Sequence, residues 1–230
     1  MPLPYPMPQF AIIRVEKLKT STAIINAVKH NAREHTPANA DPQLASFNSH
    51  HGPSSSDVLA TIDKRIQDGR APGQAAVRKD AVKAIEVLLA TSPEFAQKMR
   101  EDRQLLRAWV KLNMEFVRER YGAANIIRVD MHLDEQSPHL QLVVVPLTKD
   151  GRLSAKEVVG GRQELKKLQD DYAAAMRPLG LERGLEGSRA QHESIRKFYG
   201  RVSEQLRQEQ ARLIEERRRL AEQKGRKMGL

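Results

Sequence analysis

The chain has 230 residues, which is enough for one domain of ordinary size with an appendage. Its 39 lysine and arginine residues outnumber its 29 aspartate and glutamate residues, and the resulting net charge of +10 favours a polyanionic partner such as a nucleic acid. The absence of cysteine excludes disulfides and cysteine-based zinc sites, and no apolar run reaches the length of a membrane span, so we expect a cytoplasmic protein.

The chain begins with a proline-rich stretch, then a strand and a helix. Residues 1–8 contain four prolines and predict an irregular leader. The apolar run Phe10–Val15 predicts the first strand. A helix capped by Ser21 or Thr22 is expected to continue to about His35.

A loop and an ambiguous segment follow. Thr36–Ser56 is rich in proline, serine and asparagine and predicts a loop, in which His50 and His51 are expected to be solvated rather than functional. Asp57–Gln67 predicts a short helix. The apolar residues of Ala75–Ala90 fit one face of a helix and also one side of a strand, and the pattern alone favours the helix.

The second half of the chain predicts long helices around two strands. Pro93–Tyr121 predicts one long helix with Trp109 in the core rather than on a base-stacking surface, and Gln163–Met176 predicts another. The pattern from about Gln191 onward is helical. One heptad column there is apolar, consisting of Tyr199, Leu206, Leu213 and Leu220. We therefore expect a catalytic domain over residues 9–190 and a C-terminal helical arm or linker over residues 191–230.

The two central strands carry the chemistry. Ile126–His132 and His139–Val145 predict a hairpin. Residues two apart on a strand share a face, so His139 and Gln141 point the same way, and His132 can lie opposite them. Such a set suits one divalent metal ion and leaves coordination positions open, although two solvated histidines on a polar sheet face are the simpler reading.

The residues around this hairpin resemble a known family. HLDEQSPHLQLVVVPL (from His132) is similar to the metal-binding motif HxDExxPHxH of the MobV/Pre plasmid mobilisation relaxases, which belong to the HUH endonuclease superfamily. Other segments occur in family order over roughly Phe10–Tyr199: AVKHNAR (Ala27–Arg33), RKDAV (Arg78–Val82), GRLSAKEVVGGRQELKKLQDDY (Gly151–Tyr172) and LERGLEGSRAQH (Leu181–His192). The resemblance implies an α+β fold with a central antiparallel sheet of about five strands, helices on one face and a strand at about Val82–Leu89.

The resemblance also implies an activity and its residues. Relaxases of this family nick one strand of plasmid DNA at an origin of transfer and stay covalently joined to the 5′ end. The implied nucleophile is His30, and the implied ligands of Mn²⁺ or Mg²⁺ are His132, His139 and Gln141. Glu135 is expected to support the metal or His30, and Arg33, one turn from His30, to contact a phosphate. The rival nucleophile is a tyrosine, with candidates Tyr5, Tyr121, Tyr172 and Tyr199.

The implied partners are an origin hairpin with its adjacent single strand, the coupling protein of the conjugation machinery, and a second copy bound through the C-terminal region. The residues expected to bind DNA are Arg14, Lys17, Lys19, Arg33, Arg78 and Arg162.

Two departures from the family pattern keep alternatives open. Gln141 stands where the family has a histidine, and an arginine expected in Asp41–Asn48 is replaced near Leu44. The alternatives are a non-catalytic or weakly active DNA-binding regulator on the same fold, and a replication-initiation nuclease of the same superfamily. Relaxases of this kind usually have a longer C-terminal region, so we expect this tail to be shortened.

Overall fold

The computed structural model describes residues 9–37, 39–135, 137–184 and Arg212. The expected leader, and the expected C-terminal arm apart from Arg212, lie outside the described residues, as do Tyr5 and Tyr199. The strands are β1 (Phe10–Leu18), β2 (Ser49–His51), β3 (Ala84–Thr91), β4 (Ile126–His132), β5 (His139–Val144) and β6 (Glu182–Arg183). The helices are α1 (Ser21–Asn31), α2 (Val58–Gly69), α3 (Pro93–Glu101), α4 (Arg103–Tyr121), α5 (Ala155–Val159) and α6 (Arg162–Met176), with short 3₁₀ turns at Ala45–Phe47, Ala123–Asn125 and Arg177–Leu179.

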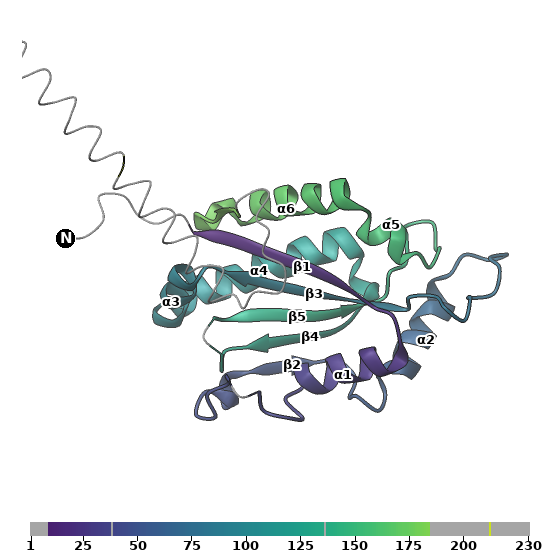
Figure 1. The fold of residues 1–230 in the computed structure, drawn as a ribbon, viewed down its shortest axis with the longest axis horizontal. Coiled ribbons are helices and arrows are strands. Elements are labelled where there is room, and N and C mark those ends of the chain that lie inside the picture. Colours follow the sequence, from purple (N-terminus) through teal and green to yellow (C-terminus); the bar gives the residue numbers. More distant parts are fainter. Residues whose placement is uncertain (1–8, 38, 136, 185–211, 213–230) are drawn as a thin grey trace, which may run out of the picture. The chain divides into compact units, whose positions relative to one another are not determined.

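The six strands form one sheet in the order β2-β4-β5-β3-β1-β6. Its pairs are antiparallel except for the two-residue β6, which lies parallel to β1. Figure 1 shows β1, β3, β5 and β4 side by side, with β2 at one edge. Because side chains alternate along each strand, each face of this sheet receives its own set of residues.

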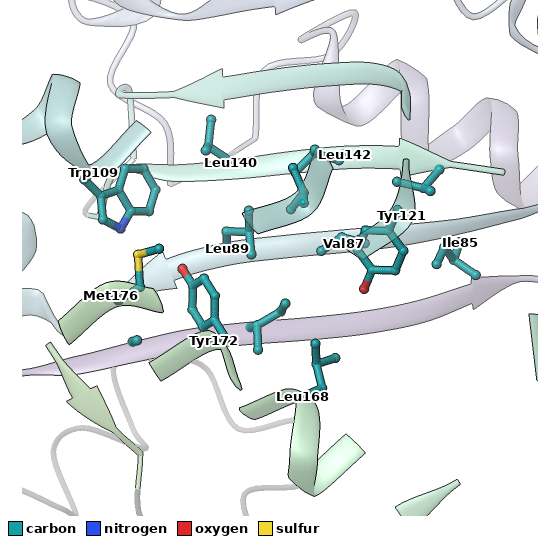
Figure 2. Close-up of a cluster of buried hydrophobic side chains, with 14 of the residues drawn as sticks. Ile85, Val87, Leu89, Trp109, Tyr121, Leu140, Leu142, Leu168, Tyr172 and Met176 are labelled. Atoms are coloured by element: carbon teal, nitrogen blue, oxygen red, sulfur yellow. The ribbon is translucent and has the colours of Figure 1, made fainter. Parts of the chain in front are cut away.

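One face of the sheet holds the larger apolar core, which α4 and α6 cover (Figure 1). Trp109 and Tyr172 are wholly buried there, and the Tyr172 hydroxyl donates a hydrogen bond of 2.8 Å to Asn113 Oδ1. Figure 2 shows them among the side chains of Leu89, Leu140 and Met176. Trp109 is therefore a core residue, as predicted, and its ring is not available to stack on a base.

Helices α1 and α2 pack on the opposite face. Their apolar residues, including Ile24, Val28 and Ile62, bury against Leu18 and Val143 of the sheet in a second cluster. The polar side chains of β4 and β5 share this face, so α1 ends beside them. No helix in the described parts of the chain is both long and apolar enough to cross a membrane.

The α+β class and the mostly antiparallel central sheet are confirmed, and the strand expected at about Val82–Leu89 is β3. The sheet has six strands, including the short β2 and β6, where about five were expected, and α1 and α2 lie on the second face, where helices on one face only were expected. The single long helix predicted from Pro93 is wrong. It is interrupted at Asp102, whose side chain accepts from the backbone N–H groups of Gln104 and Leu105 and so caps α4.

Candidate active site

The strand register places polar side chains in rows on the face that bears α1. His132 of β4 lies directly opposite His139 of β5, as the hairpin pattern predicted. In the next row, Gln141 of β5 lies opposite Asp130 of β4, which in turn lies opposite His50 of β2. The sheet thus brings together three histidines, an amide and a carboxylate from three strands.

The two facing imidazoles present lone pairs to each other. His132 Nδ1 and His139 Nε2 are 3.0 Å apart. The other nitrogen of each ring has a carbonyl acceptor, because His132 Nε2 donates to Asn31 O at 2.8 Å and His139 Nδ1 donates to Ser137 O at 3.0 Å. Each neutral ring has one N–H, so the two facing nitrogens are both acceptors, and a cation would satisfy both.

Burial keeps these rings in the neutral form that binds metals. It lowers the pKa of His132 to about 3, with the nearby His139 adding to the effect. Burial also lowers the pKa of His139, although hydrogen bonding to Ser137 O and the charge of Glu135 oppose the shift. Neutral imidazole is the ligating form, so the pair is ready to bind a metal at neutral pH.

Two oxygen-bearing side chains are candidates for a third ligand. Gln141 Oε1 is buried and has no hydrogen-bond donor among the described residues. Glu135 Oε1 is 3.9 Å from His139 Nε2, and ligand atoms of His132, Glu135 and His139 lie within 4.8 Å of one another. An orphaned amide oxygen one row from the His132–His139 pair, on the same face of the sheet, fits a divalent ion with nitrogen and oxygen ligands.

Arg33 holds the turn that carries Glu135. Its Nε and Nη2 donate to the two oxygens of Asp134 at 3.0 and 2.7 Å, and Nη2 also donates to Glu135 Oε1 at 2.6 Å. Asn39 Nδ2 donates to the other Glu135 oxygen at 2.8 Å. Burial works against these charges, but the ion pairs prevail, so the pKa of Arg33 is raised and the pKa values of Asp134 and Glu135 are lowered.

The expectation that Arg33 lies one helical turn from His30 is wrong. Helix α1 ends at Asn31, four residues before the predicted end, and Arg33 has a left-handed backbone with φ of 57°. Its guanidinium faces two carboxylates and is almost fully buried, which is the geometry of a structural ion pair and not of an exposed phosphate contact.

The loop before β2 is also attached to this turn. Asn48 Oδ1 accepts from the backbone N–H of Leu133 at 2.7 Å and of Asp134 at 3.3 Å. The backbone N–H of Asp41 donates to Asp134 O at 2.6 Å. The segment predicted as loop thus contributes to the site through its backbone and its asparagine side chains.

His30 lies in the last turn of α1 and its side chain is exposed. The next residue, Asn31, is held from two sides: its carbonyl accepts from His132, and its Nδ2 donates to Glu86 Oε1 of β3 at 2.8 Å. Glu86 is close enough for the charge of His30 to affect its pKa, which burial raises. Asn31 therefore connects two predicted site residues: it follows the predicted nucleophile His30 in the chain, and its carbonyl is hydrogen-bonded to the predicted metal ligand His132.

Sequence reasoning missed a hydrogen bond made by His50 on this face of the sheet. Its Nδ1 bonds to Asp130 Oδ1 at 2.8 Å, and its ring centroid is 6.0 Å from that of His132. Asp130 is wholly buried and also accepts from Arg128 Nε and Nη2 at 2.8 and 2.6 Å. His50 is exposed, as expected, but its bond to Asp130 was not predicted, because the loop contains β2, a strand too short to show a period.

Two of the tyrosines considered as rival nucleophiles lie in the described part of the chain. Tyr121 and Tyr172 are buried in the larger core, which removes them as nucleophiles.

Arg14 lies on the same sheet face as Gln141, since both are opposite Leu88 of β3. Among the residues expected to bind DNA, Arg33 is buried and Lys17 partly exposed, whereas the exposed ones are Arg14, Lys19, Arg78 and Arg162.

The chain matches a known family in sequence. The Mob_Pre family model, described as plasmid recombination enzyme, matches residues 7–200. A 65 kDa protein of Zymomonas mobilis is 35% identical over 204 residues, covering 87% of this chain and 34% of the relative. Plasmid recombination enzyme type 3 of Staphylococcus aureus is 32% identical over 204 residues, covering 82% of this chain and 47% of the relative.

A solved structure shares the fold. The MobM relaxase domain bound to plasmid pMV158 oriT DNA, in a Mn-bound crystal structure, matches with a TM-score of 0.71 and 29% identity, over 83% of this chain and 98% of that chain. The present chain spans about a third to a half of the length of the curated relatives named above. The family match extends over most of the chain and includes every strand of the sheet, and the chain therefore belongs to the Mob_Pre family of plasmid recombination enzymes.

Proposed function

We propose that this chain is the DNA-nicking domain of a plasmid relaxase. It would cut one strand at an origin of transfer by metal-dependent transesterification and keep a covalent link to the 5′ end. The observation that carries the proposal is the pair of facing lone pairs on His132 and His139, joined through Asn31 to the exposed His30. The Mn-bound, DNA-bound structure of the related MobM relaxase domain supports it.

The proposed metal ligands are His132, His139 and Gln141, with Glu135 as the nearest carboxylate. Two imidazoles with one or two oxygens suit Mn²⁺, and Mg²⁺ is the alternative with a stronger preference for oxygen. A bound ion would polarise a phosphodiester and offset the negative charge that develops during transfer. In this scheme Glu135 either completes the ion's ligands or stabilises the end of α1 through Arg33.

The proposed nucleophile is His30. Its neutral ring would attack phosphorus through a nitrogen lone pair. A P–N bond forms, the bond from phosphorus to the 3′ oxygen breaks, and that oxygen leaves and takes up a proton from solvent. The 5′ phosphate remains on the protein as a phosphoramidate, and attack by a 3′ hydroxyl in the reverse sense rejoins the strand.

The proposed DNA contacts follow from charge and position. The exposed Arg14, Lys19, Arg78 and Arg162, with the partly exposed Lys17, would neutralise backbone phosphates around an origin hairpin and its single strand. A cytoplasmic location, a coupling protein of the conjugation machinery and a dimer through the C-terminal region belong to the same proposal.

One assay tests the proposal. The full chain is incubated with Mn²⁺ and supercoiled DNA carrying its cognate origin, and the product is examined for a nick with protein attached to the 5′ end. The wild type should form this adduct, His30→Ala should not, and His35→Ala, a change at an exposed histidine beyond α1, should leave it intact. Absence of nicking by the wild type would reject the proposed nicking activity. Full adduct formation by His30→Ala would assign the nucleophile to another residue.

A second candidate function is a DNA-binding regulator on the same fold. The observation that favours it is Gln141, an amide at a position where the resemblance predicts a histidine. A regulator would bind origin DNA with or without Mn²⁺ and leave it supercoiled, so the same assay separates the two.

A further inference from the structure

Phe47 is exposed although its chemistry favours burial. In the described part of the chain, Phe47 is the one aromatic residue of the Phe, Tyr and Trp types that is largely exposed, with 57% of its surface accessible. Phe10, Phe95 and Trp109 are buried, and Phe116 packs edge-on against Tyr172. An exposed phenyl ring in a chain with few aromatic residues requires an explanation other than folding.

The segment that carries Phe47 is bonded to the turn between β4 and β5 through Asn48. Ala45–Phe47 forms one 3₁₀ turn immediately before β2. The next residue, Asn48, accepts from the backbone of Leu133 and Asp134. Ser49 pairs with Met131 in an antiparallel ladder. Phe47 comes two residues before Ser49, and Leu133 comes two residues after Met131, so both lie beyond the same end of this ladder. Phe47 therefore directly precedes a residue that is hydrogen-bonded to the backbone following His132.

The surroundings of Phe47 favour a nucleic acid over a protein as its partner. Arg100 of α3 donates to the carbonyls of Leu133 and Glu135 on the same turn, and His50 and His51 follow in β2. The other large apolar side chain exposed in the described residues is Leu165, on α6, which covers the opposite face of the sheet. A lone aromatic ring has the size of one nucleobase, whereas a protein interface needs a patch of many residues.

We propose that Phe47 is a stacking platform for an unpaired base close to the scissile phosphate. The inference rests on the proposed nicking function and adds a residue that holds the single strand in place. Base stacking on an aromatic side chain tolerates any sequence, because every base has a π face. Phe47 would therefore help fix the position of the strand against the metal site, while sequence is read elsewhere.

Binding measurements with the full chain test the role of Phe47. Phe47→Ala should weaken binding of a fluorescein-labelled single strand spanning the origin nick site by about 5- to 150-fold, as expected for loss of one stacked base. It should leave binding of a fully paired duplex unchanged, because neighbouring base pairs cover both faces of a base inside a duplex. Phe47→Trp should bind the single strand at least as tightly as the wild type.

A spectroscopic readout locates the base. A 2-aminopurine placed in turn at each position around the nick should be quenched at one or two adjacent positions in the wild type, and this quenching should disappear in Phe47→Ala. Leu165→Ala is the matched control, since it also removes an exposed apolar side chain, and it should change neither readout. Both variants should keep the wild-type melting temperature.

The outcomes separate this inference from the proposed function. If the wild type binds and nicks the origin while Phe47→Ala matches it in single-strand affinity and 2-aminopurine quenching, the stacking role is wrong and the nicking function stands. If the wild type neither binds nor nicks the authentic origin, both are wrong.

Discussion

Arg33 and Asp134 are 101 residues apart in the chain, yet the guanidinium donates to both carboxylate oxygens, at 3.0 and 2.7 Å. The pair joins the segment after α1 to the turn between β4 and β5. The left-handed backbone of Arg33 costs about 1 kcal/mol for a residue other than glycine, and the ion pair offsets this cost. The consequence is a fixed relation between the helix that carries His30 and the turn that carries Glu135.

Arg33→Met should therefore destabilise the fold and loosen the site. It leaves the buried Asp134 carboxylate without its partner, which typically costs about 3–5 kcal/mol of unfolding free energy. Urea unfolding measures this loss, and Lys64→Met, which breaks the exposed pair with Asp68, is the control and should cost less than about 1 kcal/mol. Equal losses in the two variants would show that the Arg33 pair is no stronger than a surface contact.

The sequence predicted the hairpin but not the contacts that hold it in place. Alternation with a period of two placed His132 opposite His139, because a strand offers only two faces. The partners of Arg33 and His50 depend on contacts between distant segments, and β2 is only three residues long, so no local pattern predicted them. The interruption at Asp102 did have a signal, since aspartate is a favoured N-cap, but the continuous apolar stripe of the segment obscured it.

Gln141 is the proposed third ligand of the metal. If its orphaned oxygen is a ligand, Gln141→Leu should weaken Mn²⁺ binding by roughly 10- to 100-fold or more, and Gln141→His should tighten it. Isothermal titration calorimetry measures both, with Glu135→Gln as the variant at the other candidate oxygen. If Gln141→Leu binds Mn²⁺ as tightly as the wild type and its unfolding free energy is about 1 kcal/mol higher, Gln141 is a buried unsatisfied amide and not a ligand.

Glu86 should make the fold less stable as the pH rises. Burial raises its pKa above the ordinary 4.5, so between these two values the folded state holds a proton that the unfolded state has released. The resulting stability is fully present below pH 4.5 and is lost as the pH rises through the folded-state pKa.

Glu86→Gln keeps an oxygen that can accept the hydrogen bond from Asn31 and removes the charge. The variant should therefore gain stability relative to the wild type at pH 8 and lose this advantage towards pH 4.5. Urea unfolding in EDTA at several pH values measures the difference. A difference between the two proteins that does not change with pH would contradict the assignment of this pH dependence to Glu86.

Gly52 allows β2 to pack closely against β4. Its φ of 134° is unfavourable for other residues, and an added Cβ would come within 2.7 Å of Ile127 O and 2.8 Å of Arg128 Cα. The carbonyl of the next residue, Pro53, accepts from Arg128 Nη1 at 2.6 Å, which orients the guanidinium that holds Asp130. The backbone at Gly52 thus supports the bond between Asp130 and His50.

Gly52→Ala should cost about 2–3 kcal/mol of unfolding free energy, because the clash involves backbone atoms that cannot move aside without breaking the ladder between β2 and β4. Gly73→Ala is the matched control: its φ of 78° is also left-handed, but nothing lies within 4 Å of the added carbon, so the cost should be about 1 kcal/mol. The excess measures how tightly β2 is held. If the two variants unfold alike, β2 does not lie close against β4, and the site must be built without the contact between His50 and Asp130.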